Sequence, residues 1–451
     1  MSFYSILEGK TMNIIRMMAV AVWCMTAWST VSYGQTTQNS ARYVHEWNRM
    51  VTDIIMKDGF SPPVISRIYS YCNMAAYQAA YRGFSGYRSL EGQIKGFPVM
   101  PQPEAGKEYK WELCAVEAYR AVVNNLLYRA NYSDSLYAAH IAELSATTNP
   151  ETAERSKKYA QDIAKELRIW YKNDGHVRNQ GRSRYVFPRS PGKWEPTPPA
   201  FADPLDPFFN TMRPFTLDSA GQFRAAPPYA YSEDPKSAFY QQNIEVYTFA
   251  KTLTKEQKDI SLFWDCNPIK TWHQGHFVFN TQMISPGGHW INIVGIASKK
   301  LQKSMIESLE AYTLVSIGLY DGFLSCWNEK YDYHLVRPIT FIHKFIDPDW
   351  EPLLQTPPFP EHTSGHSTIS ATSAQILTNL YGKNIAFDDD TEVRFGYPVR
   401  SFPSFLDAAL EASISRIWGG IHYPLACNEG NRIGKIIGNH VTKNIKLAEK
   451  K

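Results

Sequence analysis

The sequence predicts an all-α protein of stacked helical bundles, crossed by one long, proline-rich, ordered loop. Apolar residues recur at helical spacing, as in Val44, Trp47, Val51 and Ile54, whereas strand-like alternation is nearly absent. The 451 residues, 44% of them hydrophobic, suffice for one large or two modest cores. Layers of packed helices are the architecture that such a pattern favours.

The helices are expected where the apolar spacing is regular and where a proline, serine or threonine opens it. No internal repeat is visible. In chain order they cover residues 41–58, 62–81, 108–132, 133–144, 150–173, 235–250, 254–264, 289–299, 303–325, 330–345, 365–381, 404–418 and 423–447.

Residues 175–233 form the predicted long loop. They are rich in proline and in aromatic residues, which include Trp194, Phe201, Phe208, Phe209, Phe215 and Phe223. A free linker would be polar, so this loop is expected to pack over the helices. Ordered loops of this length tend to border a functional site.

Residues Met12 to Gln35 have the pattern of a secretory signal, with Arg16 before an apolar run and small residues before a cleavage point near Gly34. Translation could begin at Met12. We expect a signal peptide over residues 1–34 and a single all-α domain over 35–451, whose active-site half is 255–451. No further segment is long and apolar enough to span a membrane, which predicts a secreted or periplasmic protein. A net charge of +4 is too small to indicate nucleic acid as a partner.

The cysteines predict no special chemistry. The five beyond the signal segment are widely spaced and include no C-x-x-C pair: Cys72, Cys114, Cys266, Cys326 and Cys427. They indicate neither a zinc site nor a disulfide framework, and buried free thiols are the expectation. His273 and His276 likewise lack a carboxylate at metal-binding spacing. His289 is left open, either as a core histidine or as a residue near the active site.

The functional prediction begins with the cations Lys330 and Arg337. They are seven residues apart, so a continuous helix would present both on one face. Ser364-Gly365-His366 then opens a helical run and offers free backbone N–H groups, a hydroxyl and an imidazole, which together suit an anion.

Arg416 and His422 complete the set. A straight helix would not aim both residues inward, but Gly419-Gly420 lies between them and can end the helix and turn the chain back. Two cations, a helix N-terminus, a third cation and a second histidine would surround a tetrahedral oxyanion.

This order of motifs resembles that of one superfamily. Tryptophan-x-x-lysine, arginine-proline seven residues after the lysine, serine-glycine-histidine, and arginine with histidine six residues later are typical of type 2 phosphatidic acid phosphatases and vanadium-dependent haloperoxidases. The resemblance covers roughly the second half of the chain. The upstream segments Phe263-Trp264-Asp265 and Pro286-Gly287-Gly288-His289-Trp290 look like those of the haloperoxidases, so that branch is favoured.

The resemblance implies vanadate as the cofactor, hydrogen peroxide and halide as substrates, and an organic acceptor as a further partner. Vanadate or phosphate would be bound by Lys330, Arg337, Ser364, Gly365, Arg416 and His422. Within that set His422 would be the vanadium ligand, and Lys330 would polarise peroxide. His366 would act as the general acid and base, and Trp327 and Phe359 would line the halide pocket. Apart from the resemblance, two roles stay open for Asp265: it pairs with a site arginine and keeps it aimed, or it is an ordinary aspartate at a helix end.

One position departs from the superfamily. An aspartate usually follows the final histidine by four residues and orients its ring, but this chain has Ala426. Asn428, Glu429 or a backbone carbonyl are the candidates to replace it, because a liganding histidine needs an acceptor on its other nitrogen.

Weaker support of His422 would favour the oxidation of iodide or bromide over chloride. Two alternatives stay open at this stage. One is a periplasmic acid phosphatase with a phosphohistidine intermediate at His422, and the other is an oxyanion-binding relative with little turnover.

Overall fold

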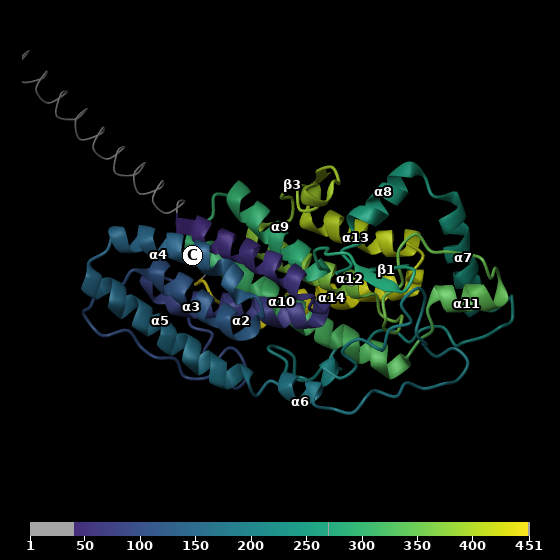
Figure 1. The fold of residues 1–451 in the computed structure, drawn as a ribbon, viewed down its shortest axis with the longest axis horizontal. Helices are drawn as coiled ribbons and strands as arrows, with labels where there is room; N and C mark the ends of the chain where they lie inside the picture. Colours follow the sequence, from purple (N-terminus) through teal and green to yellow (C-terminus); the bar gives the residue numbers. More distant parts are fainter. Residues whose placement is uncertain (1–39, 269, 450–451) are drawn as a thin grey trace, which may run out of the picture.

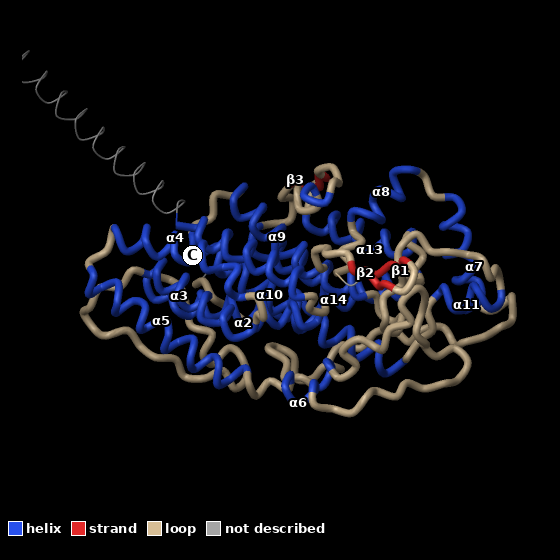
Figure 2. The backbone as a smooth tube through the Cα atoms, viewed as in Figure 1, coloured by secondary structure: helices blue, strands red, loops and turns tan. Residues whose placement is uncertain are grey.

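The computed structural model describes residues 40–268 and 270–449, and helices supply most of its regular structure, as predicted (Figures 1 and 2). The expected signal peptide lies outside the described residues. The first helix covers residues 40–58. The others are α2 (Pro62–Ala80), α3 (Trp111–Leu126), α4 (Asp134–Ala146), α5 (Pro150–Tyr171), α6 (His176–Gln180), α7 (Ala238–Thr252), α8 (Lys255–Phe263), α9 (Pro286–Lys300), α10 (Met305–Tyr333), α11 (Pro338–Phe345), α12 (Gly365–Tyr381), α13 (Phe405–Trp418) and α14 (Pro424–Asn444). Short 3₁₀ turns are η1 (Tyr81–Gly83), η2 (Ala130–Ser133), η3 (Phe209–Thr211) and η4 (Val393–Phe395).

Two small antiparallel hairpins were not predicted. Strands β1 (Thr271–Gln274) and β2 (Phe277–Asn280) pair in one sheet, and β3 (Phe387–Asp389) and β4 (Arg400–Phe402) pair in the other. Each strand has only three or four residues. Such lengths are too short for alternation to be recognised in a sequence.

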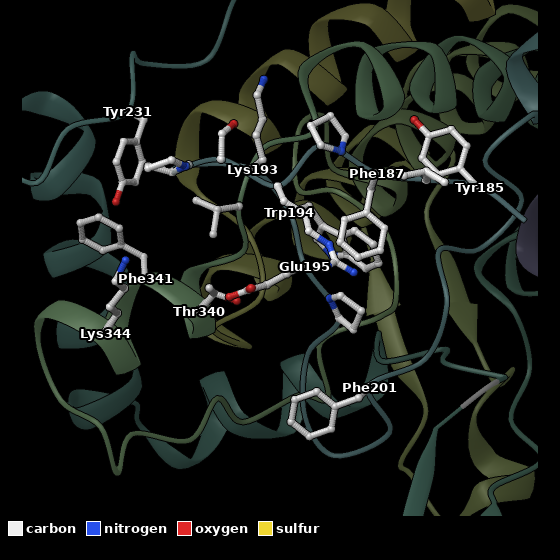
Figure 3. A pocket seen from close by; sticks show the side chains of 18 of the residues that line it. Tyr185, Phe187, Lys193, Trp194, Glu195, Phe201, Tyr231, Thr340, Phe341 and Lys344 are labelled. Carbon is white, nitrogen blue, oxygen red and sulfur yellow. The ribbon is translucent and has the colours of Figure 1, made fainter.

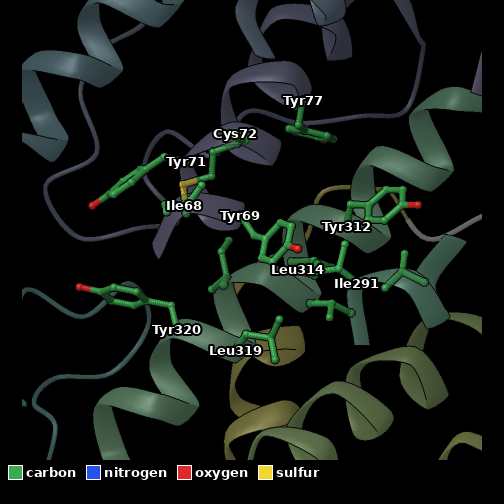
Figure 4. Close-up of a cluster of buried hydrophobic side chains, with 14 of the residues drawn as sticks. Ile68, Tyr69, Tyr71, Cys72, Tyr77, Ile291, Tyr312, Leu314, Leu319 and Tyr320 are labelled. Atoms are coloured by element: carbon green, nitrogen blue, oxygen red, sulfur yellow. The ribbon is translucent and has the colours of Figure 1, made fainter. Parts of the chain in front are cut away.

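The molecule is elongated, with α3, α4 and α5 towards one end and α7 and α11 at the other (Figure 1). Helix α12 packs against α10, α13 and α14, and α2 packs against α3 and α10. Figure 4 shows the core where α2, α9 and α10 meet, with Tyr69, Ile291, Tyr312 and Leu319 among its buried side chains. Burial of such side chains stabilises the fold by about 1.5–3 kcal/mol each.

Helix α14 approaches α12 unusually closely because it carries a glycine at every fourth position of one face. A Cβ on Gly434 would lie 2.2 Å from the carbonyl oxygen of Thr368, and one on Gly438 would lie 2.7 Å from that of Thr372. A Cβ on Gly430 would lie 2.9 Å from Ser367. The glycines therefore hold the start of α12, where Ser364 and His366 are, against the start of α14.

The prediction of one helix over residues 330–345 is wrong. Helix α10 continues through Lys330 to Tyr333 and ends at His334, whose φ of 51° is left-handed. Helix α11 begins only at Pro338, with Arg337 as its extended N-cap residue. A residue before proline is driven out of helical geometry, so Lys330 and Arg337 belong to different elements and do not share a helix face.

The predicted helix over residues 108–132 is also interrupted. Helix α3 ends at Leu126, and Leu127 is extended, with φ −106° and ψ 137°. The chain resumes as the 3₁₀ turn η2 before α4. Two weak helix formers, Asn124 and Asn125, precede the break.

The long loop packs on the helices, as predicted. Apart from α6 and η3 it is irregular. Trp194 is buried and donates its backbone N–H to the carbonyl of His334 at 2.6 Å. Leu205 donates its N–H to the carbonyl of Pro358 at 2.9 Å. The loop therefore lies against the segment that leads into α12.

The expectation of buried free thiols is confirmed, since all five described cysteines are buried and free. Within residues 40–268 and 270–449, no helix is both long and apolar enough to cross a membrane. The longest helix, α10, has 29 residues, but its last turns carry Glu329, Lys330 and Asp332.

Candidate active site

A small cavity lies where the predicted motifs meet. Its volume, measured as the space that the centres of water molecules can occupy, is about 40 Å³. A single water needs roughly 10–15 Å³ of such space, so the cavity accommodates about three or four oxygen-sized atoms. Seven of the predicted site residues line it, and they come from α10, α12, α13 and three loops: Asp265, Trp327, Phe359, Gly365, His366, Arg416 and His422. Pro62 of α2 also lines it, so the amino-terminal helices contribute to the site.

Ser364 caps α12, as its position in the sequence predicts. Its hydroxyl oxygen accepts the backbone N–H of Ser367 at 3.3 Å and the hydroxyl of Ser367 at 2.9 Å. With both bonds accepted, the proton on the Ser364 hydroxyl is free to donate elsewhere. A Cβ added at Gly365 would meet only the ring of Trp327, at 3.9 Å, so the space in front of this helix start is open.

His422 follows the predicted glycine turn. Helix α13 ends at Trp418, and Gly420 has a φ of 79°, which only glycine adopts without strain. A Cβ on Gly420 would also lie 2.9 Å from Pro352 and 3.1 Å from Trp350. The turn brings His422 and Arg416 to the same cavity, as the sequence analysis expected.

Glu361, which belongs to none of the sequence motifs, holds the ring of His422. The Nδ1 of His422 donates to the Oε1 of Glu361 at 2.8 Å, and the backbone N–H of Tyr423 donates to the same oxygen at 2.9 Å. Burial raises the pKa of Glu361 to about 7, against the opposing effect of Arg337. In the sequence, the one sign of this role is an acidic residue within the stretch Phe359-Pro360-Glu361-His362, because a carboxylate beside apolar residues needs a partner if it is buried.

The candidates near Ala426 do not supply this carboxylate. Asn428 is exposed on α14. Glu429 pairs with Arg432 at 2.7 Å and accepts the backbone N–H of Ala226 at 2.7 Å. The predicted supporting role of Asn428 is therefore wrong, because its position on α14 faces solvent.

Arg337 approaches the other nitrogen of His422. Its Nη1 lies 3.2 Å from Nε2 of His422 and donates to the carbonyl of Ile421 at 2.7 Å, while its Nε donates to the carbonyl of Phe359 at 2.8 Å. With Nδ1 donating to Glu361, Nε2 carries the lone pair. Burial and the charges of Arg337 and Lys330 hold the pKa of His422 well below its ordinary value, so the ring is neutral and able to act as a ligand.

Arg416 and His366 share one wall of the cavity. Arg416 donates from Nη2 to the carbonyl of Ser261 at 3.2 Å and from Nη1 to the backbone carbonyl of Asp265 at 3.5 Å. The carboxylate of Asp265 instead lies 3.4 Å from Lys270. Asp265 therefore contacts Arg416 through its backbone carbonyl, and not through its carboxylate as predicted. Burial and the charge of Arg416 keep the pKa of His366 well below its usual value, so its imidazole is neutral.

Lys330 is fully buried behind the cavity. Its Nζ donates to the carbonyls of Pro360 at 2.9 Å, Glu361 at 3.0 Å and Thr363 at 2.5 Å, which occupies all three of its N–H donors. Of the three predicted cations, Arg416 lines the small cavity, whereas Lys330 and Arg337 do not. Burial lowers the pKa of Lys330 to about 7. In this structure it fixes the segment before Ser364.

Trp327 and Phe359 form the apolar side. Their ring centroids are 5.0 Å apart at an interplanar angle of 50°. The indole N–H of Trp327 donates to the carbonyl of Leu205 at 3.2 Å, so the long loop fixes this ring. The Nζ of Lys330 lies 4.9 Å from the centre of the Phe359 ring.

The small cavity opens towards a larger one of about 520 Å³. The two share four lining residues: Asn267, Pro268, Gln355 and Pro357. Residues 197–205 of the long loop contribute to the outer cavity, which confirms that this loop borders the site.

A larger cavity, of about 760 Å³, lies elsewhere in the molecule, and Figure 3 shows side chains that line it. Residues 184–196 of the long loop and part of α11 line it, with Tyr231 and Phe341 facing each other across one side. No residue of the predicted oxyanion site lines it, so its size alone does not mark the reactive centre.

The residues around the small cavity fit a tetrahedral oxyanion. Nη2 of Arg337 and Nε2 of His366 are buried without a hydrogen-bond partner in the described part of the chain. An unpartnered buried donor on a guanidinium is costly, so an anion would satisfy it. Arg416, the open start of α12 and the unprotonated Nε2 of His422 add to this arrangement.

Comparisons with known proteins agree with this geometry. A profile of the VCPO second helical-bundle domain matches residues 310–449. The first bacterial vanadium-dependent iodoperoxidase structure is 40% identical, with a TM-score of 0.84, over 91% of this chain and 97% of that one. Apo and holo bacterial vanadium-dependent chloroperoxidases are 14% identical, with TM-scores of 0.65 and 0.63; they cover 85% and 86% of this chain, and each match spans 94% of that chain.

A search of curated protein sequences finds no significant match. The chloroperoxidases, at their low identity, establish only a shared fold. The iodoperoxidase is similar in sequence over nearly the whole length of both chains. The chain therefore belongs to the vanadium-dependent haloperoxidases, a family of enzymes whose cofactor is vanadate.

Proposed function

We propose that this haloperoxidase uses hydrogen peroxide to oxidise halide, with iodide preferred, at vanadate held in the small cavity. The observation that carries the proposal is the convergence of Arg337, Arg416 and His422 beside the apolar pair Trp327 and Phe359. Bound vanadate supplies a Lewis-acid centre that activates peroxide without changing oxidation state.

We assign the anion contacts to groups that are free to donate. Arg337 through Nη2, Arg416, the Ser364 hydroxyl and the Gly365 N–H would donate to the oxygens of the bound anion. His422 would ligate through Nε2, which the hydrogen bond from Nδ1 to Glu361 leaves unprotonated.

His366 would transfer protons, and Lys330 would supply positive charge. His366 is neutral and has an unpartnered Nε2, so it would accept a proton from hydrogen peroxide and return it later. Lys330 would act mainly through its charge and through the three carbonyls it holds, unless anion binding displaces one of them.

Iodide is preferred for two reasons. It is the least strongly hydrated of the three halides, so it loses the least hydration free energy beside the apolar rings of Trp327 and Phe359. It is also the easiest of the three to oxidise. The 40% identical relative is an iodoperoxidase. The inference that Ala426 weakens the support of His422 no longer contributes, because Glu361 supplies that support.

Hydrolysis of phosphate esters remains a second candidate, and Glu361 favours it. A nucleophilic histidine needs a carboxylate on its far nitrogen, and His422 has one at 2.8 Å. The apolar side of the cavity favours the first candidate, since an ester phosphate would gain nothing from Trp327 and Phe359.

One set of assays separates the two activities. Apo-protein is assayed with a chromogenic phosphate ester, and then with vanadate, peroxide and each halide at matched peroxide concentration. We expect vanadate-dependent oxidation that is fastest with iodide. Ester hydrolysis that vanadate only inhibits, without halide oxidation, would overturn the proposal, and efficient chloride oxidation would overturn the iodide preference.

We also propose export of the protein, supported by the signal pattern over residues 12–35. Amino-terminal sequencing of protein recovered from outside the cytoplasm is expected to begin near residue 35. An intact start at Met1 or Met12 would contradict this.

A further inference from the structure

Behind one wall of the small cavity, three buried side chains place a sulfur, a nitrogen and an oxygen around one point. The Sγ of Cys266 lies 3.3 Å from Nδ1 of His289 and 3.5 Å from Oε1 of Glu392. The same nitrogen and oxygen are 3.1 Å apart. The three residues come from the loop after α8, from α9 and from the residue before η4, and at most 1% of each is exposed.

These separations match the edges of a tetrahedral zinc site. Zinc bonds of about 2.3 Å to sulfur, 2.0–2.1 Å to nitrogen and 2.0–2.2 Å to oxygen imply donor separations of roughly 3.3–3.6 Å. The observed edges need shifts of only a few tenths of an ångström.

The surroundings of His289 also suit a metal ligand. Its far nitrogen, Nε2, lies 2.7 Å from Oδ2 of Asp389, and Oδ1 of that carboxylate accepts the backbone N–H of Thr391 at 3.0 Å. A carboxylate that holds the far nitrogen of a histidine is the usual support of a metal-bound imidazole. The Oε2 of Glu392 is buried without a partner in the described residues, which leaves it available as a fourth donor.

We propose that Cys266, His289 and Glu392 bind a zinc ion, with Asp389 orienting the histidine. A mixed sulfur, nitrogen and oxygen set favours zinc over magnesium or calcium, which prefer oxygen alone. Zinc would replace the thiol proton of Cys266 and the Nδ1 proton of His289, so the total charge of this buried cluster would not change.

The role of this ion would be to fix the wall of the active site. Cys266 lines the small cavity, and its neighbour Asp265 supplies the carbonyl that Arg416 contacts. Cys266 itself has a left-handed backbone, with a φ of 42°, which is unfavourable for a residue with a side chain. Zinc would hold this loop to α9 and to the segment before η4, three parts of the chain that are far apart in sequence.

The test measures the zinc content of the full-length protein. The protein is produced in zinc-supplemented medium, and any affinity tag is removed. Elemental analysis after gel filtration is expected to find about one zinc per chain, counted separately from vanadium. Cys266→Ala and Glu392→Gln are expected to lose it. Cys114→Ala, which removes a buried sulfur elsewhere, is the matched control and is expected to keep it.

Cobalt in place of zinc reports the ligands directly, because a cobalt–thiolate bond gives a charge-transfer absorption. The wild-type protein is expected to show this band and Cys114→Ala to retain it. Folded wild-type protein without zinc and without the cobalt band would overturn the proposal, even if the Cys266 variant does not fold. Equal zinc content in Cys266→Ala and Cys114→Ala would overturn it as well.

Discussion

Glu361 and His422 are 61 residues apart in the chain, yet the Oε1 of Glu361 accepts the Nδ1–H of His422 at 2.8 Å in a fully buried contact. Glu361 lies in the segment that Lys330 holds by its carbonyls, and His422 lies just after the glycine turn. The contact fixes which nitrogen of His422 carries the proton and leaves Nε2 facing Arg337.

Glu361→Gln is expected to weaken vanadate binding by about 10–100-fold, the usual cost of changing the partner of a metal-bound histidine. The amide oxygen can still accept the hydrogen bonds from His422 and Tyr423, but the amide lacks the charge that raises the basicity of the ring. Equilibrium dialysis of apo-protein against vanadate measures the affinity.

Glu429→Gln is the control, since Glu429 pairs with Arg432 and not with His422. It is expected to bind vanadate like the wild type. Equal losses in both variants would show that the Glu361 contact has no special role.

His422→Ala and His366→Ala are expected to separate binding from turnover. His422→Ala removes the proposed ligand and is expected to weaken vanadate retention by about 100-fold or more. His366→Ala is expected to retain vanadate and to lower the rate of iodide oxidation by about 10²–10⁴-fold, the usual contribution of a general acid–base. Dialysis followed by vanadium analysis measures retention, and steady-state kinetics measures turnover. The same loss of vanadate in both variants would contradict the division of roles.

Gly420→Ala is expected to disturb the turn that places His422. It adds a left-handed residue with a side chain and brings its Cβ to 2.9 Å from Pro352, so we expect a loss of about 2–4 kcal/mol in unfolding free energy and weaker vanadate binding. Gly396→Ala, with a φ of 89° and nothing within 4 Å, is the control and is expected to cost about 1 kcal/mol. Denaturant titrations compare the two, and equal destabilisation would exclude the close contact as the cause.

Glu310 is expected to make stability depend on pH. Burial raises its pKa from 4.5 to about 7, so between these values the folded state holds a proton that the unfolded chain has released. Its contribution is therefore present below pH 4.5 and lost as the pH rises to about 7. Glu310→Gln, which stays neutral, is expected to be about 1–2 kcal/mol more stable than the wild type at pH 8 but not at pH 4.5.

Unfolding midpoints at both pH values measure this difference. Glu245→Gln, on an exposed position of α7, is the control and is expected to follow the wild type at both. A Glu310 variant that tracks the wild type across the range would show that this carboxyl does not titrate with folding.

Much of the site was predictable from the sequence because local rules govern it. Serine at an N-cap and glycine after it start α12 with free N–H groups, and glycine at position 420 allows the reversal that brings His422 to Arg416. The break between Lys330 and Arg337 is also local, since His334 ends α10 in a left-handed conformation and Pro338 keeps Arg337 out of helical geometry.

Other relationships were decided only by the tertiary structure. Glu361 meets His422, and Cys266 meets His289 and Glu392, across 61, 23 and 126 residues of sequence, with no spacing that local rules could recognise. Close packing of α14 on α12 through Gly434 places the start of α12, and the long loop fixes the ring of Trp327. A sequence by itself determines which functional side chains are available and which turns precede them. Packing against distant helices decides which of these side chains are buried together, and burial together sets their protonation states.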